Sequence, residues 1–177
     1  MSETNILHTA RLTLTPPVMA DFEGSAALWA EPEVVRYITG KPSTRTEAWG
    51  RFQRQAGAWA LLGYGAWTVR ERASGRYVGE IGFGNFKREI EPGFGDAPEA
   101  GWVLAPWSHG QGLATEAVTA AHAWGEARFK GERTVCMIDP ANTASLGVAA
   151  KLGYTEFART RFLDSDVVLL ERPLPRA

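Results

Sequence analysis

Two glycines just before a stretch of helical character form the first feature that could do chemistry. Gly110 and Gly112 lie in a small-residue turn at 109–114, between a strand expected at 101–104 and a helix expected at 115–129. The first N–H groups of a helix have no partner inside it, and the helix dipole places positive charge there. Glycines have no Cβ, so an anion can approach the main chain closely. We interpret this turn as a cradle for a pyrophosphate group.

Two other glycine-rich phosphate sites can be compared with this turn. A P-loop requires Lys followed by Ser or Thr directly after its glycines, and no such pair follows Gly112. A dinucleotide-binding fingerprint requires a third glycine, and that position is Thr115. The turn also lies about two thirds of the way along the chain, not after a first strand. The turn therefore fits neither of these sites.

The segment 109–114, His-Gly-Gln-Gly-Leu-Ala, is similar to the [RQ]-x-x-G-x-[GA] acetyl-CoA-binding motif of the GNAT acyltransferase superfamily. His109 departs from that motif, because the family usually has Arg or Gln there. Segments 114–118, 142–145 and 151–154 resemble the ribosomal-protein N-terminal acetyltransferase branch. The resemblance covers nearly the full chain. It implies a GNAT-like fold, acetyl-CoA as co-substrate and transfer of the acetyl group to a primary amine.

The resemblance also implies a set of cofactor-binding residues. Main-chain N–H groups at 110–114 would bind the CoA pyrophosphate, and strand groups at 103–105 would hold the pantetheine arm and polarise the thioester carbonyl. Asn142, a favoured N-cap residue in its own right, would contact the pantetheine arm. The expected set is Val103, Leu104, Ala105, His109, Gly110, Gln111, Gly112, Leu113, Ala114, Thr115, Asn142, Ser145 and Lys151.

Acetyl transfer to an amine requires a neutral amine, whose conjugate acid has a pKa of about 10. A base or a chain of waters must therefore accept a proton at neutral pH. Glu99 opens the central strand and Glu80 lies in the preceding one, where strand alternation puts it on a face with Val78 and Gly82. The resemblance favours Glu99, and Glu80 and water remain open.

Ser145 is the candidate for stabilising the departing thiolate. The resemblance implies a hydroxyl near the cofactor sulfur, which many family members supply from a Tyr at the position of Ala149. We therefore assign this role to Ser145, at the third position of the last expected helix. Glu116 would repel phosphates and is expected to point away from them. Cys136 lies in an apolar strand and is expected to be a core residue, not a nucleophile.

The overall composition limits the classes of function. The chain has 177 residues, of which 45% are hydrophobic, and a net charge of −1, as in an ordinary soluble protein; we expect one domain spanning 1–177. It has no basic block for nucleic acid, no apolar run for a membrane and no metal-ligand spacing. Residues 1–5 lack the features of a signal peptide, so we expect a cytoplasmic protein, monomeric or homodimeric.

Hydrophobic periodicity and turn residues predict an α/β (α+β) fold with a mixed, mostly antiparallel sheet of six or seven strands, flanked by about four helices. The strands are expected at 9–15, 66–70, 76–83, 101–104, 133–138, 154–160 and 167–172. The helices are expected from about 21 to 31, 43 to 62, 115 to 129 and 143 to 152, with one further helical turn after Pro32 at 33–38.

The identity of the amine is left open by the sequence. Segments 34–47, 87–99 and 161–166 are expected to face the acceptor, and the last two are rich in acids, which would suit a cationic acceptor. A protein N-terminus, an amino acid, a polyamine and an antibiotic amine all remain open. The main hypothesis is direct attack of the amine on the thioester. A CoA-binding regulatory module without turnover and an enzyme using another acyl-CoA are the alternatives.

Overall fold

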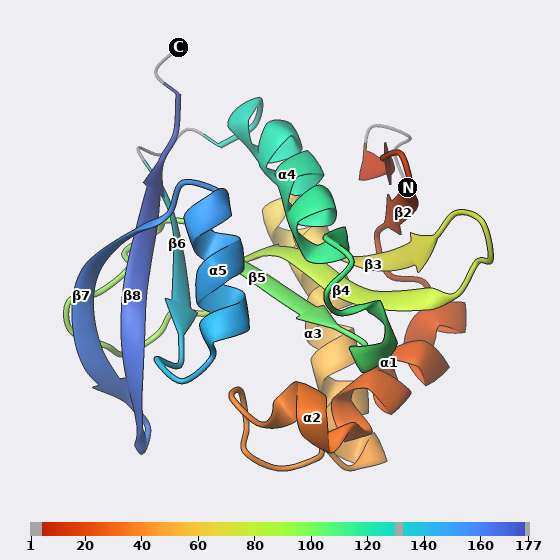
Figure 1. Ribbon diagram of the computed structural model, residues 1–177, viewed down its shortest axis with the longest axis horizontal. Helices are drawn as coiled ribbons and strands as arrows, with labels where there is room; N and C mark the ends of the chain where they lie inside the picture. The colour runs from red at the N-terminus through yellow and green to blue at the C-terminus, as the bar shows by residue number, and fades with distance from the viewer. Residues whose placement is uncertain (1–4, 130–132, 176–177) are drawn as a thin grey trace.

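The computed structural model describes residues 5–129 and 133–175 of the chain. Residues 1–4, most of the segment in which no signal peptide is expected, lie outside the described residues. The described ranges form one sheet in the order β1-β2-β3-β4-β5-β6-β8-β7 (Figure 1). Its strands are β1 Leu7–His8, β2 Leu12–Thr15, β3 Ala66–Glu71, β4 Tyr77–Gly84, β5 Glu99–Leu104, β6 Arg133–Ile138, β7 Thr155–Phe162 and β8 Ser165–Pro173. The helices are α1 Phe22–Ala30, α2 Pro32–Val35, α3 Arg45–Leu62, α4 Leu113–Glu126 and α5 Thr143–Lys151, with 3₁₀ turns at Met19–Asp21 and Pro106–Ser108.

The predicted fold class is confirmed, with small differences in the number of elements. Every pair of neighbouring strands is antiparallel except β5 and β6, which run parallel. The described part of the chain has one strand more than the upper expectation, because the two residues of β1 pair with β2. It also has a fifth α-helix, the four-residue α2, which begins at Pro32. Proline suits a first helical turn, where no N–H partner is needed.

The longest helix, α3, begins and ends close to the predicted residues for reasons visible in the sequence. The Thr44 side chain accepts a hydrogen bond from the backbone N–H of Glu47, and the Glu47 carboxylate accepts one from the backbone N–H of Thr44. This reciprocal capping box satisfies N–H groups that the first turn leaves free. The helix ends at Gly63, whose φ of 74° is the left-handed conformation that glycine tolerates best.

Helix α4, which follows the glycine turn, is shifted from its predicted position. It was expected at 115–129 and runs from Leu113 to Glu126. Its start is earlier because Gly112, with φ 76°, turns the chain directly into the first helical residue. It ends in a turn where the N–H groups of Arg128 and Phe129 both donate to the carbonyl of Gly125, at 2.8 Å.

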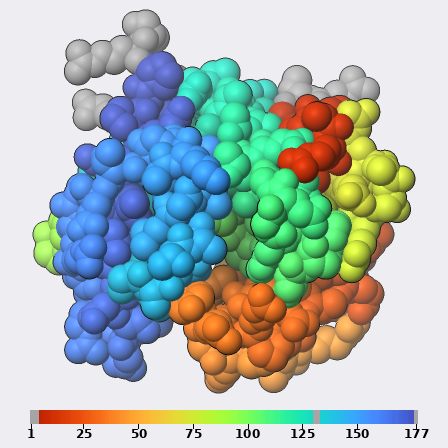
Figure 2. Space-filling model, viewed as in Figure 1, coloured from red at the N-terminus to blue at the C-terminus, as the bar shows by residue number. Residues whose placement is uncertain are grey.

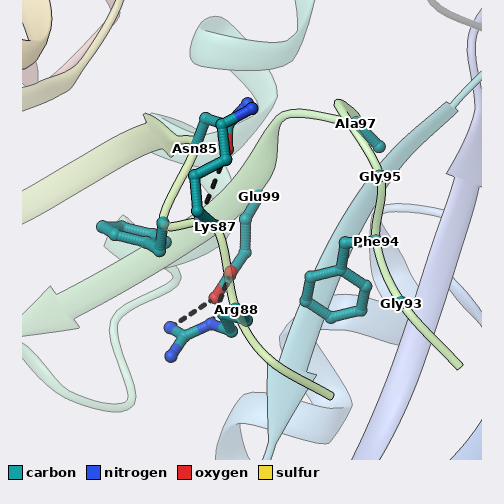
Figure 3. A pocket seen from close by; sticks show the side chains of 9 residues that line it. Asn85, Lys87, Arg88, Gly93, Phe94, Gly95, Ala97 and Glu99 are labelled. Carbon is teal, nitrogen blue, oxygen red and sulfur yellow. Dashed lines mark hydrogen bonds and ion pairs between the residues drawn. The ribbon is translucent and has the colours of Figure 1, made fainter. Parts of the chain in front are cut away.

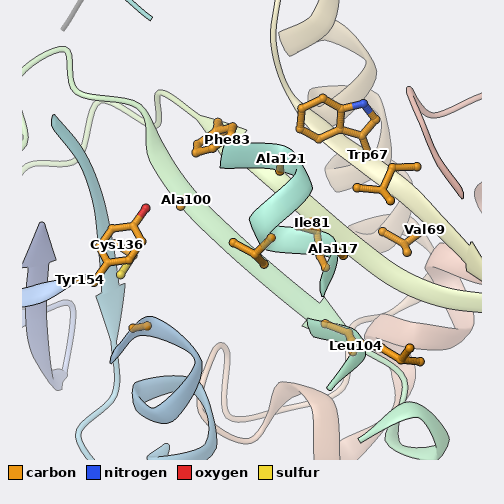
Figure 4. Packing of buried hydrophobic residues seen from close by; sticks show 14 of the residues in the cluster. Trp67, Val69, Ile81, Phe83, Ala100, Leu104, Ala117, Ala121, Cys136 and Tyr154 are labelled. Carbon is orange, nitrogen blue, oxygen red and sulfur yellow. The ribbon is translucent and has the colours of Figure 1, made fainter. Parts of the chain in front are cut away.

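One face of the sheet is covered by α4 and forms the main apolar core (Figure 4). Trp67 and Ile81 come from neighbouring strands, and Ala117 and Ala121 from the helix that covers them. Small alanines on the helix leave room for the large side chains of the strands, as close packing requires. The other face is covered by α1 and α3, and this is the face that carries the two candidate carboxylates.

Candidate active site

The turn before α4 presents a row of free main-chain donors. Within the described residues, the six consecutive N–H groups of 110–115 have no intramolecular acceptor, and the series of bonds begins again where Glu116 donates to Gly112 (3.0 Å). Gly110 and Gly112 have φ values of 72° and 76°, so both adopt the left-handed conformation. A Cβ on Gly110 would meet open space. Free donors, two αL glycines and a helix start together are an arrangement that can bind an anion.

An N-terminal arginine that sequence reasoning missed fastens this turn. Arg11 donates to both main-chain and side-chain acceptors, reaching the carbonyl of Gln111 at 2.9 Å and the Glu116 carboxylate at 2.7 Å. Thr9 donates to the same carboxylate at 2.6 Å. Glu116 therefore points to the connection between β1 and β2, away from the free N–H groups of the turn, as predicted. Partial burial raises the pKa of Glu116, but these hydrogen bonds outweigh it and the pKa is lowered. The Arg11 guanidinium also brings positive charge beside the turn.

Two side chains of the turn, those of His109 and Gln111, contact other groups of the protein and do not point outward toward a ligand. His109 Nε2 lies 2.9 Å from the carbonyl oxygen of Leu104, and its Nδ1 lies 3.8 Å from the carboxylate of Glu33. Gln111 donates its side-chain amide to the carbonyl of Trp107 (2.8 Å). Both side chains therefore brace the turn, and the groups facing outward are main-chain N–H groups.

The main-chain groups of β5 that face the β6 side come mostly from residues other than the predicted 103–105. Ala105 donates its N–H to Val78 of β4 at 2.8 Å, so it belongs to the β4 ladder. Hydrogen-bonding direction alternates along an antiparallel strand, so Val103 also faces β4, whereas Trp102 and Leu104 face the β6 side. Of the predicted residues 103–105, Leu104 alone presents its groups to that edge, and Trp102 was missed.

The edge is open because β5 and β6 separate. Their parallel pairing has one registered pair, Glu99 with Val135, supported by the Val135 N–H donating to Pro98 (3.0 Å). Beyond it, the two strands point in different directions (Figure 1). Since no β6 partner is registered opposite Trp102 and Leu104, the main-chain groups of Trp102 and the N–H of Leu104 are available to a ligand between the strands, whereas the Leu104 carbonyl is already contacted by His109.

The start of α5 lies after the carboxyl end of β6. Asn142 caps this helix through its Oδ1, which accepts from the N–H of Ser145 at 3.1 Å, as predicted. Ser145 is half-buried at the third helical position. Lys151 is exposed in the last turn of the same helix, at the opposite end from Asn142, so the structure does not bring these two together. The turn before α4 and the start of α5 are both visible on the face shown in Figure 2.

The opposite sheet face has an opening at Gly101. This central-strand residue is exposed, and a Cβ built on it would meet no atom within 4 Å. Its neighbours across the ladder are Gly82 of β4 and, two residues on, Gly84 opposite Glu99. A Cβ on Gly82 would meet the backbone of Gly65 and Ala66, and one on Gly84 the ring of Phe86, so the open space lies at Gly101, where a ligand can come close to the backbone.

Glu99 lies at one end of this opening and is held by an arginine. Arg88 donates to both carboxylate oxygens, with Nε–Oε2 at 2.6 Å and a terminal nitrogen to Oε1 at 2.7 Å (Figure 3). The pair lines a pocket of about 240 Å³. Arg88 also lies over the rings of Phe86 and Phe162, at 5.0 and 4.9 Å. Two of the segments expected to face the acceptor therefore meet at this arginine.

Glu80, the alternative base, lies deep in a network of uncharged donors. Its carboxylate accepts from Ser25 (2.5 Å) and Trp29 (2.9 Å) of α1, from Gln55 of α3, and from the Tyr77 hydroxyl at 3.1 Å. Burial, and then the charge on Glu80, raise the pKa of Tyr77, so its hydroxyl stays protonated and donates. The carboxylate is 4% exposed. The position of Glu80 therefore suits a hydrogen-bond acceptor that holds α1, α3 and β4 together.

The expectation that Glu80 shares a face with Val78 was wrong. The β3–β4 register shifts between Val69 and Arg70, so that Val69 pairs with Gly79 and Arg70 with Tyr77. The extra residue turns Val78 into the α4 core, while Tyr77 joins Glu80 on the other face. Such a bulge cannot be read from a strand's alternation.

Other candidate groups fall into the core. Cys136 is 1% exposed, as expected, and burial raises the pKa of its thiol, which disfavours a thiolate. Across the described ranges, no cluster of three or more His, Cys, Asp or Glu side chains could hold a metal ion. No helix in those ranges is long and apolar enough to cross a membrane.

Comparisons with known proteins agree with this arrangement. Residues 11–155 match the family model described as the acetyltransferase (GNAT) domain. A putative GNAT-family acetyltransferase from Bordetella pertussis is 32% identical with a TM-score of 0.84, over 94% of this chain and 98% of that one. The uncharacterized protein YkkB of Bacillus subtilis is 27% identical over 148 residues, which are 82% of this chain and 81% of that protein.

A more distant likeness concerns the fold alone. RimL, a ribosomal L7/L12 α-N-protein acetyltransferase solved with coenzyme A, is 18% identical with a TM-score of 0.79, over 96% of this chain and 98% of that one. The GNAT family takes acetyl groups from acetyl-CoA. The family model spans most of the chain, and the sheet, the turn before α4 and the helices agree with that family. This chain therefore belongs to the GNAT family and is an N-acetyltransferase.

Proposed function

We propose that this enzyme acetylates a primary amine by direct attack of the amine on the thioester of acetyl-CoA. The observation that carries this proposal is the row of six unpartnered N–H groups at 110–115, beside the edge where β5 and β6 separate. These donors fit a pyrophosphate, and the free main-chain groups of Trp102 with the free N–H of Leu104 fit an extended arm that continues along β5. Bound acetyl-CoA would supply the activated acyl group.

We assign the proton-accepting role to Glu99. It lies at the opening over Gly101, by which an amine can reach the sheet centre, whereas Glu80 has four donors on its two oxygens. Arg88 contacts both oxygens of the Glu99 carboxylate and fixes its direction. An incoming amine would replace one of the two Arg88 contacts, and Glu99 would then accept its proton directly or through water.

Ser145 is proposed to stabilise the leaving thiolate. Its hydroxyl has no hydrogen-bond partner within the described residues, and its N–H is already satisfied by Asn142. A hydroxyl near the start of a helix can donate to an anion without competing with the helix's own bonds. The other proposed cofactor contacts are the main-chain groups of 110–115 and of Trp102, the N–H of Leu104, and Asn142. Val103 and Ala105 face β4, the His109 side chain holds the turn and Lys151 lies at the far end of α5, so these four are not retained.

The test of the cofactor site is a matched pair of substitutions. Gly112→Asn keeps a residue that tolerates positive φ but places a side chain at the cradle, and Gly63→Asn makes the same change at φ 74° in open space after α3. We expect CoA affinity, measured by calorimetry, to fall roughly tenfold or more in Gly112→Asn only. Equal affinities in two folded variants would contradict the cradle.

Turnover is tested by thiol release with acetyl-CoA over a panel of amines. We also expect dephospho-CoA to bind more tightly than pantetheine, since only the former carries the pyrophosphate that the six N–H groups would bind. Release with a longer acyl-CoA but not with acetyl-CoA would transfer the proposal to another acyl donor. CoA binding without release across all donors and amines would contradict it.

A further inference from the structure

Three of the six acids in the acid-rich segments near the site are paired with a cation of their own segment. Asp96 lies 2.7 Å from the ammonium of Lys87, Glu99 is paired to Arg88, and Asp166 lies 3.7 Å from Arg161. These acids were the reason to consider a cationic acceptor. Since these three already have a cation from the same segment, that reason is weakened for them, while Glu89, Glu91 and Asp164 form no ion pair among the described residues.

The third segment expected to face the acceptor, 34–47, borders a region of positive charge. A pocket of about 250 Å³ lies between the loop after α2 and the first turns of α3. Its lining contains three cations and one carboxylate among Thr39, Lys41, Pro42, Ser43, Glu47, Gly50, Arg51 and Arg54. The carboxylate is that of Glu47, which already accepts from the N–H and hydroxyl of Thr44 at 2.7 and 2.9 Å. The pocket is therefore cationic, and its single acid serves the helix cap.

Among the described residues, none of the three cations of this pocket forms an ion pair. The guanidinium of Arg51 lies 3.7 Å from the ring centroid of Trp29, and its buried Nε has no hydrogen-bond partner in the described ranges. Burial first, and then the like charge of Arg54, lower the pKa of Arg51. An arginine that is stacked on an aromatic ring and keeps free N–H donors is arranged to bind an oxyanion.

The pocket is built from fixed elements and lies on the acceptor side of the sheet. Its loop wall is anchored by the Ser43 N–H, which donates to the carbonyl of Trp29 at 2.8 Å. The indole N–H of Trp29 donates in turn to Glu80, which pairs with Val103 of β5. Glu80 and Val103 share their face with Gly101, so the pocket and the opening over the sheet belong to the same side.

We infer that the pocket of Lys41, Arg51 and Arg54 binds an oxyanionic group, carboxylate or phosphate, of the acceptor amine. The enzyme would then select amines that carry an anion. This inference rests on the proposed function for the place of the amine, while the anion site itself rests on the pocket alone. The two are therefore tested by separate measurements.

The first measurement is a chemical-shift titration of the Trp29 indole N–H with succinate or inorganic phosphate. The protein is saturated with CoA beforehand, so that its phosphates occupy the cradle. We expect a saturable shift in the unchanged chain, with an affinity roughly tenfold weaker in Arg51→Gln and in Arg54→Gln. The matched control is Arg45→Gln, which removes an exposed cation of α3 paired to Glu23 outside the pocket. No saturable shift, or equal affinities in all four proteins, would overturn the inference.

The second measurement compares amines in matched pairs: β-alanine with its amide, and phosphoethanolamine with ethanolamine. We expect kcat/KM to be roughly tenfold or more higher for the anionic member of a pair, and Arg54→Gln to abolish that advantage mainly through KM. The pair with the larger ratio identifies the anion as carboxylate or phosphate. Turnover without preference would overturn the inference and leave the proposed function. Saturable shifts without turnover of any amine would overturn the proposed function and leave the anion site.

Discussion

Glu80 and Glu99 lie on the same face of the sheet and are both nearly buried, at 4% and 7% exposure, yet they are held in different ways. Glu80 accepts from four uncharged donors on α1, α3 and β4. Glu99 is held by one cation, Arg88, from the connection between β4 and β5. A carboxylate tied to three elements is part of the fold, whereas one held by a single loop arginine can exchange its partner. We therefore expect Glu80 to serve stability and Glu99 turnover.

The largest expected effect comes from Glu99→Gln. Loss of the proton acceptor should lower kcat/KM by roughly 10²–10⁴-fold near neutral pH. The defect should shrink as pH rises, because solution then supplies neutral amine. A pH-rate profile checks this. A loss that is independent of pH and smaller than about tenfold would move the role to water.

The same substitution at the other carboxylate, Glu80→Gln, should lower the stability of the folded protein. Its new NH₂ group would face donors that now meet an acceptor, and we expect the free energy of unfolding to fall by roughly 3–5 kcal/mol. Turnover per folded molecule should stay near that of the unchanged chain. Urea unfolding together with active-site titration measures both. A stable but inactive Glu80→Gln protein would reverse the comparison between the two carboxylates.

A buried histidine of α4, His122, extends the comparison to the opposite sheet face. His122 is 3% exposed, its Nε2 lies 3.1 Å from the Tyr154 hydroxyl, and burial lowers its pKa to about 4 from 6.5. The unfolded chain binds a proton below pH 6.5 that the folded chain takes up only near pH 4. Stability should therefore fall as pH decreases through that window, by up to about 3 kcal/mol.

The variant His122→Gln removes this titration, so its unfolding free energy should depend less on pH across the same window. Paired denaturant curves at several pH values give the difference, in which the carboxylates common to both proteins cancel. Identical slopes in the two proteins would show that His122 is not held neutral by the fold.

The smallest expected effect is that of Gly101→Val on the acceptor. The added side chain meets open space, and valine suits a strand, so the unfolding free energy should change by no more than about 1 kcal/mol. The KM for the amine should rise by roughly tenfold because the opening is filled, with CoA affinity unchanged. Gly57→Ala on α3, also in open space, is the control. An unchanged KM would place the acceptor elsewhere.

Much of the fold follows from local signals. The capping box of Thr44 and Glu47, the left-handed glycines and the Asn142 cap each involve residues a few positions apart, so their geometry is set by the nearby sequence. The turn before α4 was recognised for the same reason. The prediction that Glu116 points away also held, although its partners Thr9 and Arg11 lie more than 100 residues away in the chain.

The parts that could not be predicted depend on long-range pairing. The bulge that turns Val78 to the other face arises from the β3–β4 register, and the roles of Trp102 and Leu104 depend on which strand each residue faces. The Arg88–Glu99 pair joins a loop without periodicity to the central strand. Arg51 shows no signal in the sequence, because its place on Trp29 is set by how α1 and α3 pack.

The sequence by itself determined the fold class, the phosphate-binding type of turn, the helix caps and the pair of carboxylates to consider, because these rest on residue type and short-range spacing. The tertiary structure alone decided how the two carboxylates differ, which strand groups remain free, and where charge is left unpaired. Those properties depend on partners brought together by the sheet and by the helices on its faces. Burial then makes each of them costly to change, because a buried polar group must keep a partner.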